Sequence, residues 1–61
     1  MTTLIENSRK AAEVAKQEIA KIKEWLNPTD SEFYLADDAY LGADWAIKKL
    51  DDLEAALQDR S

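Results

Sequence analysis

Apolar and small side chains recur at alternating steps of three and four residues through the first part of the chain. The positions that share this spacing are Ile5, Ser8, Ala12, Ala15, Ile19, Ile22 and Leu26. Such a stripe is typical of a helix that packs against another helix, and lysine and glutamate fill most of the remaining positions. Thr3 and Glu6 have the spacing of a capping box, which starts a helix. The pattern therefore predicts a helix over residues 3–26.

A second helical pattern follows the only proline, Pro28. Proline cannot continue a helix and disfavours the helical conformation of the preceding residue, so we expect a turn over residues 27–29. Thr29 and Glu32 have capping-box spacing, and they introduce a helix over residues 30–59. Its apolar positions form two overlapping stripes, which together are broader than one partner helix covers. They are Phe33, Ala36, Tyr40, Ala43, Ile47, Leu50 and Leu57 in one stripe, and Ala39, Ala43, Ala46, Leu50, Leu53 and Leu57 in the other.

The two patterns predict an all-α fold, a single antiparallel helical hairpin over residues 1–61, because so short a connection makes the helices neighbours. Folding the chain back at the turn is expected to set small residues against small residues at the middle of the hairpin. These are Ala12 and Ala15 on one helix, and Ala43 and Ala46 on the other. We interpret Gly42 as a position of close backbone approach rather than as a kink. Trp25 and Phe33 flank the turn and are expected to close the core there.

Some apolar side chains have no place in such a hairpin. Leu53 and Leu57 lie on turns that overhang the shorter first helix, and Leu41 and Trp45 lie off both stripes. Chains of this length seldom bury enough apolar surface to fold alone. The sequence therefore predicts self-association, most simply a homodimer that forms a four-helix bundle, or else a higher oligomer.

The composition limits the kinds of metal site, catalysis and membrane insertion that the chain can support. The chain of 61 residues has no Cys and no His, which excludes disulfides, thiolate or imidazole metal ligands and a histidine base. An EF-hand loop beginning at Asp37 places Gly42 correctly, but Ala39, Leu41 and Lys48 then stand where ligands are needed. No apolar run is long enough to span a membrane. We therefore expect no catalysis, no metal and no cofactor, and the lack of cysteine fits the cytoplasm.

The net charge of −5 is unevenly distributed. Residues 1–27 carry five basic and four acidic side chains, whereas residues 28–61 carry three basic and nine acidic ones. An acidic second half disfavours nucleic acid and fits a protein partner with a basic surface. In size and acidity the chain is similar to small bacterial or phage-encoded inhibitors and regulators. The residues expected to bind such a partner are Tyr34, Asp37, Leu41, Asp44, Trp45, Asp51 and Asp52, with acids that speed the encounter and aromatic side chains that anchor the complex.

Three alternatives remain open at this point. The first is an oligomer that sequesters a small anionic or nucleotide ligand between protomers, using Arg9, Tyr40, Trp45, Lys48 and Lys49. The second is an RNA-binding bundle, similar in architecture to the Rop family of helical hairpins, in which Arg9, Lys16 and Lys23 form a basic stripe at seven-residue spacing. The third is a pure oligomerisation module. Trp45 and Leu41 are expected first at the contact between copies, with a foreign partner and a stacked small ligand as the alternatives.

Overall fold

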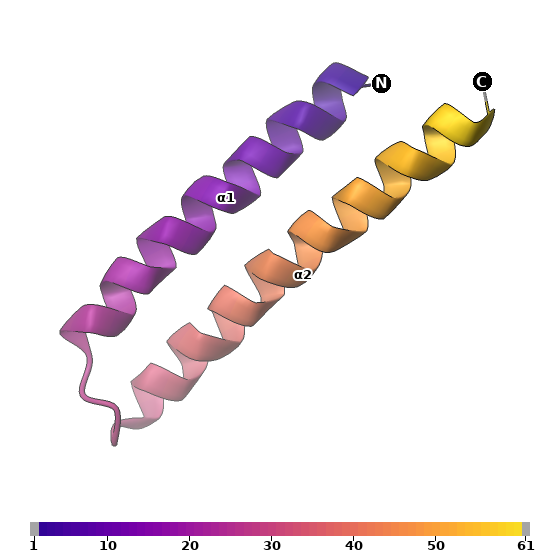
Figure 1. The fold of residues 1–61 in the computed structure, drawn as a ribbon. Coiled ribbons are helices and arrows are strands. Elements are labelled where there is room, and N and C mark those ends of the chain that lie inside the picture. The colour runs from indigo at the N-terminus through magenta and orange to yellow at the C-terminus, as the bar shows by residue number, and fades with distance from the viewer. Residues whose placement is uncertain (1, 61) are drawn as a thin grey trace.

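Two long helices lie side by side and run in opposite directions in the computed structural model, which describes residues 2–60 (Figure 1). Helix α1 spans Thr2–Trp25 and helix α2 spans Ser31–Arg60. The start of α1 and the end of α2 lie at the same end of the rod, and the turn closes the other end. The expected all-α hairpin is thus confirmed, and each helix begins and ends within one residue of its expected bounds.

Asn27 organises the turn. Its Oδ1 atom accepts hydrogen bonds from the backbone N–H of Thr29 (3.1 Å) and from the Thr29 hydroxyl (2.9 Å). The backbone N–H of Asp30 donates to the Asn27 carbonyl at 2.9 Å, which closes a β-turn with Pro28 at its second position. Because α2 begins only at Ser31, the residue that directly precedes the helix is Asp30, and the capping box expected at Thr29 is wrong.

The hairpin is a thin rod with little core. Its principal extents are 49 × 14 × 9 Å, and its radius of gyration is 14.4 Å. A compact domain of this length has a radius of gyration of about 10.5 Å. Among the described residues, Ile5 is the one hydrophobic side chain that is fully buried, at 5% exposure. A single copy therefore leaves most of its apolar side chains in contact with water.

Helix α1 turns a different stripe toward α2 from the one that hydrophobicity predicts. Ile5, Ala12 and Ile19 face α2 as expected, but Ser8, Ala15 and Ile22 are exposed. The residue that directly follows each of these three in sequence has a long basic side chain, and this side chain is half-buried against α2 instead. These residues are Arg9, Lys16 and Lys23. The predicted seam is therefore only partly correct, because the charged side chains compete successfully for the contact with α2.

The expected close approach at Gly42 is also wrong. Helix α2 runs unbroken through Gly42, and a Cβ atom added there meets no atom within 4 Å beyond its chain neighbours and the adjacent backbone of its own helix. Gly42 is exposed, on the side of α2 that faces away from α1. The turn end differs from expectation too, because Trp25 is 89% exposed, whereas Phe33 is half-buried and packs edge-on against Tyr34. Trp25 therefore does not close the core.

Candidate functional site

Three basic side chains of α1 form ion pairs with acids of α2 at regular intervals, and we call these three rungs the ion-pair ladder. Arg9 Nε lies 2.9 Å from Asp51 Oδ1, and Arg9 Nη2 donates to Glu54 Oε1 at 3.1 Å. Lys16 Nζ donates to Asp44 Oδ1 at 2.9 Å. The third rung joins Lys23 Nζ to Asp37 Oδ1 at 2.8 Å. Cations seven residues apart on α1 thus meet acids seven residues apart on α2.

The register of the hairpin follows from this arrangement. In each of the three rungs the residue numbers of cation and aspartate add up to 60, because the helices run in opposite directions. A slip of one helical turn takes every cation away from its aspartate, whereas a slip of seven residues sets most of the cations opposite an acid again. The short turn around Asn27 excludes the longer slip, since it leaves no spare chain. Ladder and turn together therefore select one register.

The middle rung has the most elaborate surroundings. The hydrogen bond from Lys16, and then the one from Lys48 at 3.3 Å, lower the pKa of Asp44 below its ordinary value. The same contact with Asp44 raises the pKa of Lys16. The Lys16 ammonium also lies 5.2 Å from the centre of the Tyr40 ring, and the Lys23 ammonium lies 4.9 Å from it. Tyr40 thus stacks between two cations that are already paired with acids.

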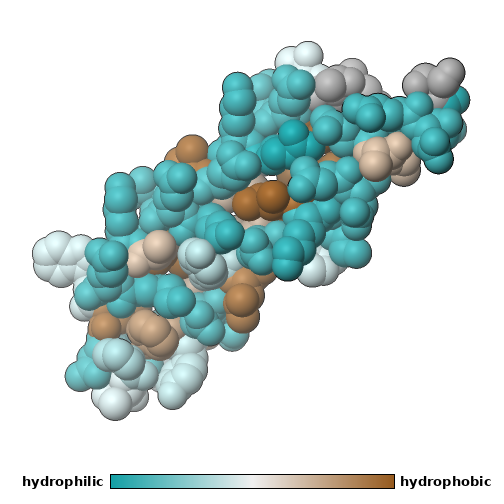
Figure 2. Space-filling model, viewed as in Figure 1, coloured by the Kyte–Doolittle hydropathy of each residue, from teal (hydrophilic) through white to brown (hydrophobic). Residues whose placement is uncertain are grey.

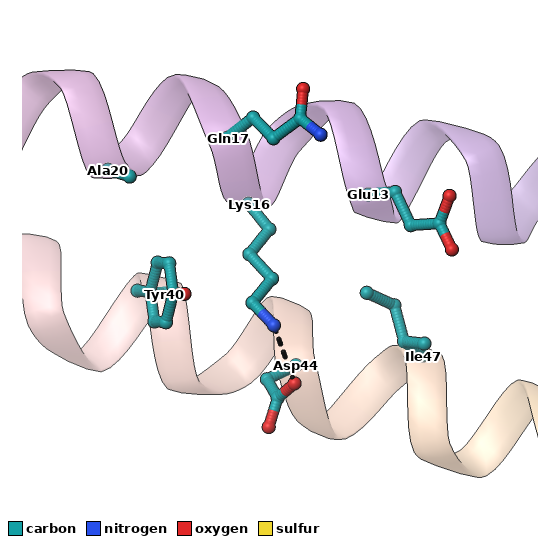
Figure 3. Close-up of a pocket in the computed structure, with 7 residues that line it drawn as sticks. All are labelled: Glu13, Lys16, Gln17, Ala20, Tyr40, Asp44 and Ile47. Carbon is teal, nitrogen blue, oxygen red and sulfur yellow. Dashed lines mark hydrogen bonds and ion pairs between the residues drawn. The ribbon is translucent and has the colours of Figure 1, made fainter.

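A shallow pocket opens beside this rung. It has a volume of about 370 Å³ and is lined by Glu13, Lys16, Gln17, Ala20, Tyr40, Asp44 and Ile47 (Figure 3). Two carboxylates face it, and its one cation, Lys16, is engaged with Asp44. A second hollow of similar size lies next to it, bounded by Ala20, Lys23, Glu24 and Tyr40. The acidic lining favours neither an anion nor a nucleotide phosphate.

The structure does not gather the residues considered for an anionic ligand. Arg9 is paired with Asp51 and Glu54 near the chain ends, whereas Tyr40 lies between the helices on the turn side of the middle rung. Lys49 extends over the Trp45 ring, 5.8 Å from its centre, on the outer side of α2. The basic stripe considered for RNA is likewise turned toward α2, and every one of its members is paired with an acid.

The outer side of α2 carries a separate surface, which we call the aromatic–acidic face. Helical spacing aligns Tyr34, Asp38, Leu41, Trp45 and Asp52 along it, pointing away from α1. Tyr34 and Trp45 are each 62% exposed and Leu41 is 55% exposed. Among residues 2–60, Asp38 takes part in no ion pair, whereas Asp52 is held loosely by Lys49 at 3.9 Å. Hydrophilic residues cover most of the broad side of the rod that Figure 2 shows, with apolar surface in small separate areas.

The expected partner-binding residues therefore divide into two groups. Tyr34, Leu41, Trp45 and Asp52 lie together on the aromatic–acidic face. Asp37, Asp44 and Asp51 instead form the ladder. Hydrophobic periodicity misses the ladder because it ranks lysine and arginine as outward-facing. The signal that reveals it is the matched seven-residue spacing of opposite charges on the two predicted helices.

Within residues 2–60, no group of three or more acidic side chains has the geometry to hold a metal ion. Neither α1 nor α2 combines the length and the apolar character that crossing a bilayer requires. The chain matches no protein-family model, no curated protein and no solved structure in the comparisons made.

Proposed function

We propose that this protein is a small non-catalytic binding module that presents the aromatic–acidic face of α2 to a protein partner with a basic surface. The observation that carries the proposal is the exposed row of Tyr34, Leu41 and Trp45, which helical spacing places on the side of α2 away from α1. Tryptophan and tyrosine are the side chains that most often anchor protein–protein contacts. An exposed apolar row of this kind is costly in water unless a partner covers it.

Charge supports a basic partner. The chain carries a net charge of −5, and Asp38 and Asp52 flank the aromatic side chains on the same face. Acids beside an aromatic anchor accelerate encounter with a positive surface and disfavour acidic competitors. The negative net charge also disfavours a nucleic-acid partner. In addition, the basic side chains Arg9, Lys16 and Lys23 are already paired with acids of α2.

The proposal is tested by capture of a partner on the full chain, followed by binding measurements with the purified partner. We expect Trp45→Ala to weaken binding at least about tenfold, as the loss of an anchor residue does. Charge reversal at Asp38 and Asp52 is expected to slow association and to reduce its dependence on salt. Val14→Glu is the matched control, because Val14 is similarly exposed but lies on α1.

Two results contradict the proposal. One is a partner whose affinity is the same for Trp45→Ala and for the unaltered chain. The other is quenching of tryptophan emission by micromolar nucleotide that depends on Lys48 and Lys49, which is the signature of the ligand-sequestering alternative.

A further inference from the structure

The broad side of the hairpin opposite the pocket carries a second unpartnered surface, which we call the alanine–leucine face. Helical periodicity places Ala15 and Ile22 of α1 on this side, next to Ala43, Ala46, Leu50 and Leu53 of α2. Ile22 is 52% exposed and Leu53 is 46% exposed in the single hairpin. The centre of this face carries no charged side chain, and Glu18 and Glu32 lie only at its margins.

The size of the exposed surface indicates what covers this face. The hairpin has an accessible surface of 4764 Å². A folded monomer of its mass, 6.9 kDa, exposes about 4000 Å². The excess of about 760 Å² is close to the roughly 800 Å² that each partner buries in a standard protein–protein interface. One further molecule that covers one face therefore reduces the accessible surface area of the hairpin to that of an ordinary folded protein of the same mass.

The fold itself identifies that molecule as a second copy. With Ile5 as the one fully buried apolar side chain among residues 2–60, the hairpin lacks the core that a chain of this length needs. If the hairpin needs a second molecule on its apolar face in order to fold, that molecule must be present whenever the chain folds. Another copy of the same chain meets this condition. Both helices contribute to the face, so two copies stacked face to face make a closed, symmetric four-helix bundle.

We propose that the alanine–leucine face is the interface of a two-fold homodimer. The ladder, the pocket and the aromatic–acidic face lie outside this interface and remain accessible in the dimer. The alanines Ala15, Ala43 and Ala46 lie near the middle of the rod, where they allow the two layers to approach closely. The larger Ile22 and Leu53 lie toward its two ends. This inference does not rest on the proposed partner, since it concerns a different side of the molecule.

Matched leucines on α2 test the assignment. Leu53→Glu places a carboxylate inside the proposed interface, whereas Leu41→Glu makes the same change on the outer side of the same helix. By sedimentation at micromolar concentration we expect a dimer for the unaltered chain and for Leu41→Glu. Leu53→Glu is expected to raise the dissociation constant of the dimer at least about tenfold. Ile22→Glu and Val14→Glu form the equivalent pair on α1.

A cysteine variant keeps the test decisive if Leu53→Glu fails to fold. The chain has no cysteine of its own, so Ala15→Cys and Leu41→Cys each introduce a single thiol. A short bis-maleimide is expected to join two copies of Ala15→Cys with retained helical content, and to leave Leu41→Cys uncoupled. The inference is overturned by a folded monomer at micromolar concentration, by an assembly of more than two copies, or by dissociation with Leu41→Glu in place of Leu53→Glu.

Discussion

Lys16 Nζ lies 2.9 Å from Asp44 Oδ1 at the middle of the rod, where the pattern of small residues predicts alanine packed against alanine. Both side chains are about two-thirds buried. Ala15, the neighbour of Lys16, is turned outward instead. The consequence is a hairpin whose internal contact is partly ionic, and which leaves Ala15 exposed and able to form a different contact.

The first prediction concerns this pair. Lys16→Met and Asp44→Leu are each expected to lower the melting temperature, because each leaves a half-buried charge without its partner across the hairpin. Asp44→Leu is expected to cost more, since after Lys16→Met the Asp44 carboxylate still has Lys48 at 3.3 Å. The double variant is expected to melt above either single variant, because two apolar groups then replace the pair. Thermal unfolding followed by circular dichroism measures all three, and strict additivity of the two losses contradicts the prediction.

The second prediction concerns pH. The pKa of Asp44 is lowered in the folded state by Lys16 and Lys48, so its contribution to stability is complete above the unfolded pKa of about 3.9. That contribution is lost as the pH falls through the lower, folded value. The pKa of Lys16 is raised by Asp44, so its contribution is complete below about pH 10.4 and is lost as the pH rises through the higher, folded value.

Urea midpoints measured across this pH range test the assignment. Asp44→Asn is expected to flatten both the acid and the alkaline decline, because it removes the group that shifts Lys16 as well as the shifted carboxyl. Asp38→Asn is the matched control, an aspartate of the same helix on the outer face and outside the ladder. An equal flattening by both variants assigns the pH dependence to net charge and not to the middle rung.

Much of this hairpin could be predicted from the sequence, and the limit has a physical cause. Pro28 and the apolar spacing define the fold class and place the helix ends within one residue, although the expected capping boxes do not form the helix starts. The rotation of α1 about its axis is less well determined. Its two candidate stripes, one small and apolar and one basic, lie side by side, and only the acids of α2 choose between them.

The outward surfaces follow the same logic. Leu41 and Trp45 stand outside both predicted stripes, and the structure leaves them exposed. The spacing of Leu41, Trp45 and Leu53 along α2 does not by itself show that Leu53 lies on a different side of the molecule from the other two. The answer depends on which side of α2 meets α1. Once the ladder fixes that side, the aromatic–acidic face and the alanine–leucine face separate.

The third prediction concerns Gly42. Glycine inside a helix costs about 1 kcal/mol relative to alanine, and nothing near Gly42 requires the missing Cβ atom. Gly42→Ala is therefore expected to stabilise the protein by up to about 1 kcal/mol, which raises the melting temperature by about 4–8 °C in a domain of this size. A lower melting temperature for Gly42→Ala reveals a contact at this position that is absent from the single hairpin.

The fourth prediction concerns Ile5, the buried apolar side chain near the open end of the hairpin. Ile5→Ala is expected to destabilise the protein by about 2 kcal/mol or more, because it removes buried methyl groups and leaves a cavity. Ile22→Ala distinguishes the stability of the single hairpin from that of the dimer, since Ile22 is exposed in one copy and lies on the alanine–leucine face. Chemical denaturation measures the loss of unfolding free energy caused by Ile22→Ala at several protein concentrations. If this loss becomes smaller on dilution, which favours dissociated chains, it belongs to the dimer.

The last prediction concerns the two tryptophans, which lie outside the alanine–leucine face. Trp25 is 89% exposed, and Trp45 stands on the outer side of α2. Trp25→Phe leaves Trp45 as the single reporter. Its emission is expected to resemble that of tryptophan in water, to be quenched readily by acrylamide, and to stay unchanged when the dimer is diluted into single chains. A blue-shifted emission that moves to longer wavelength on dilution places Trp45 between copies. In that case the aromatic–acidic face is itself the contact between copies, and it is not free for a basic partner.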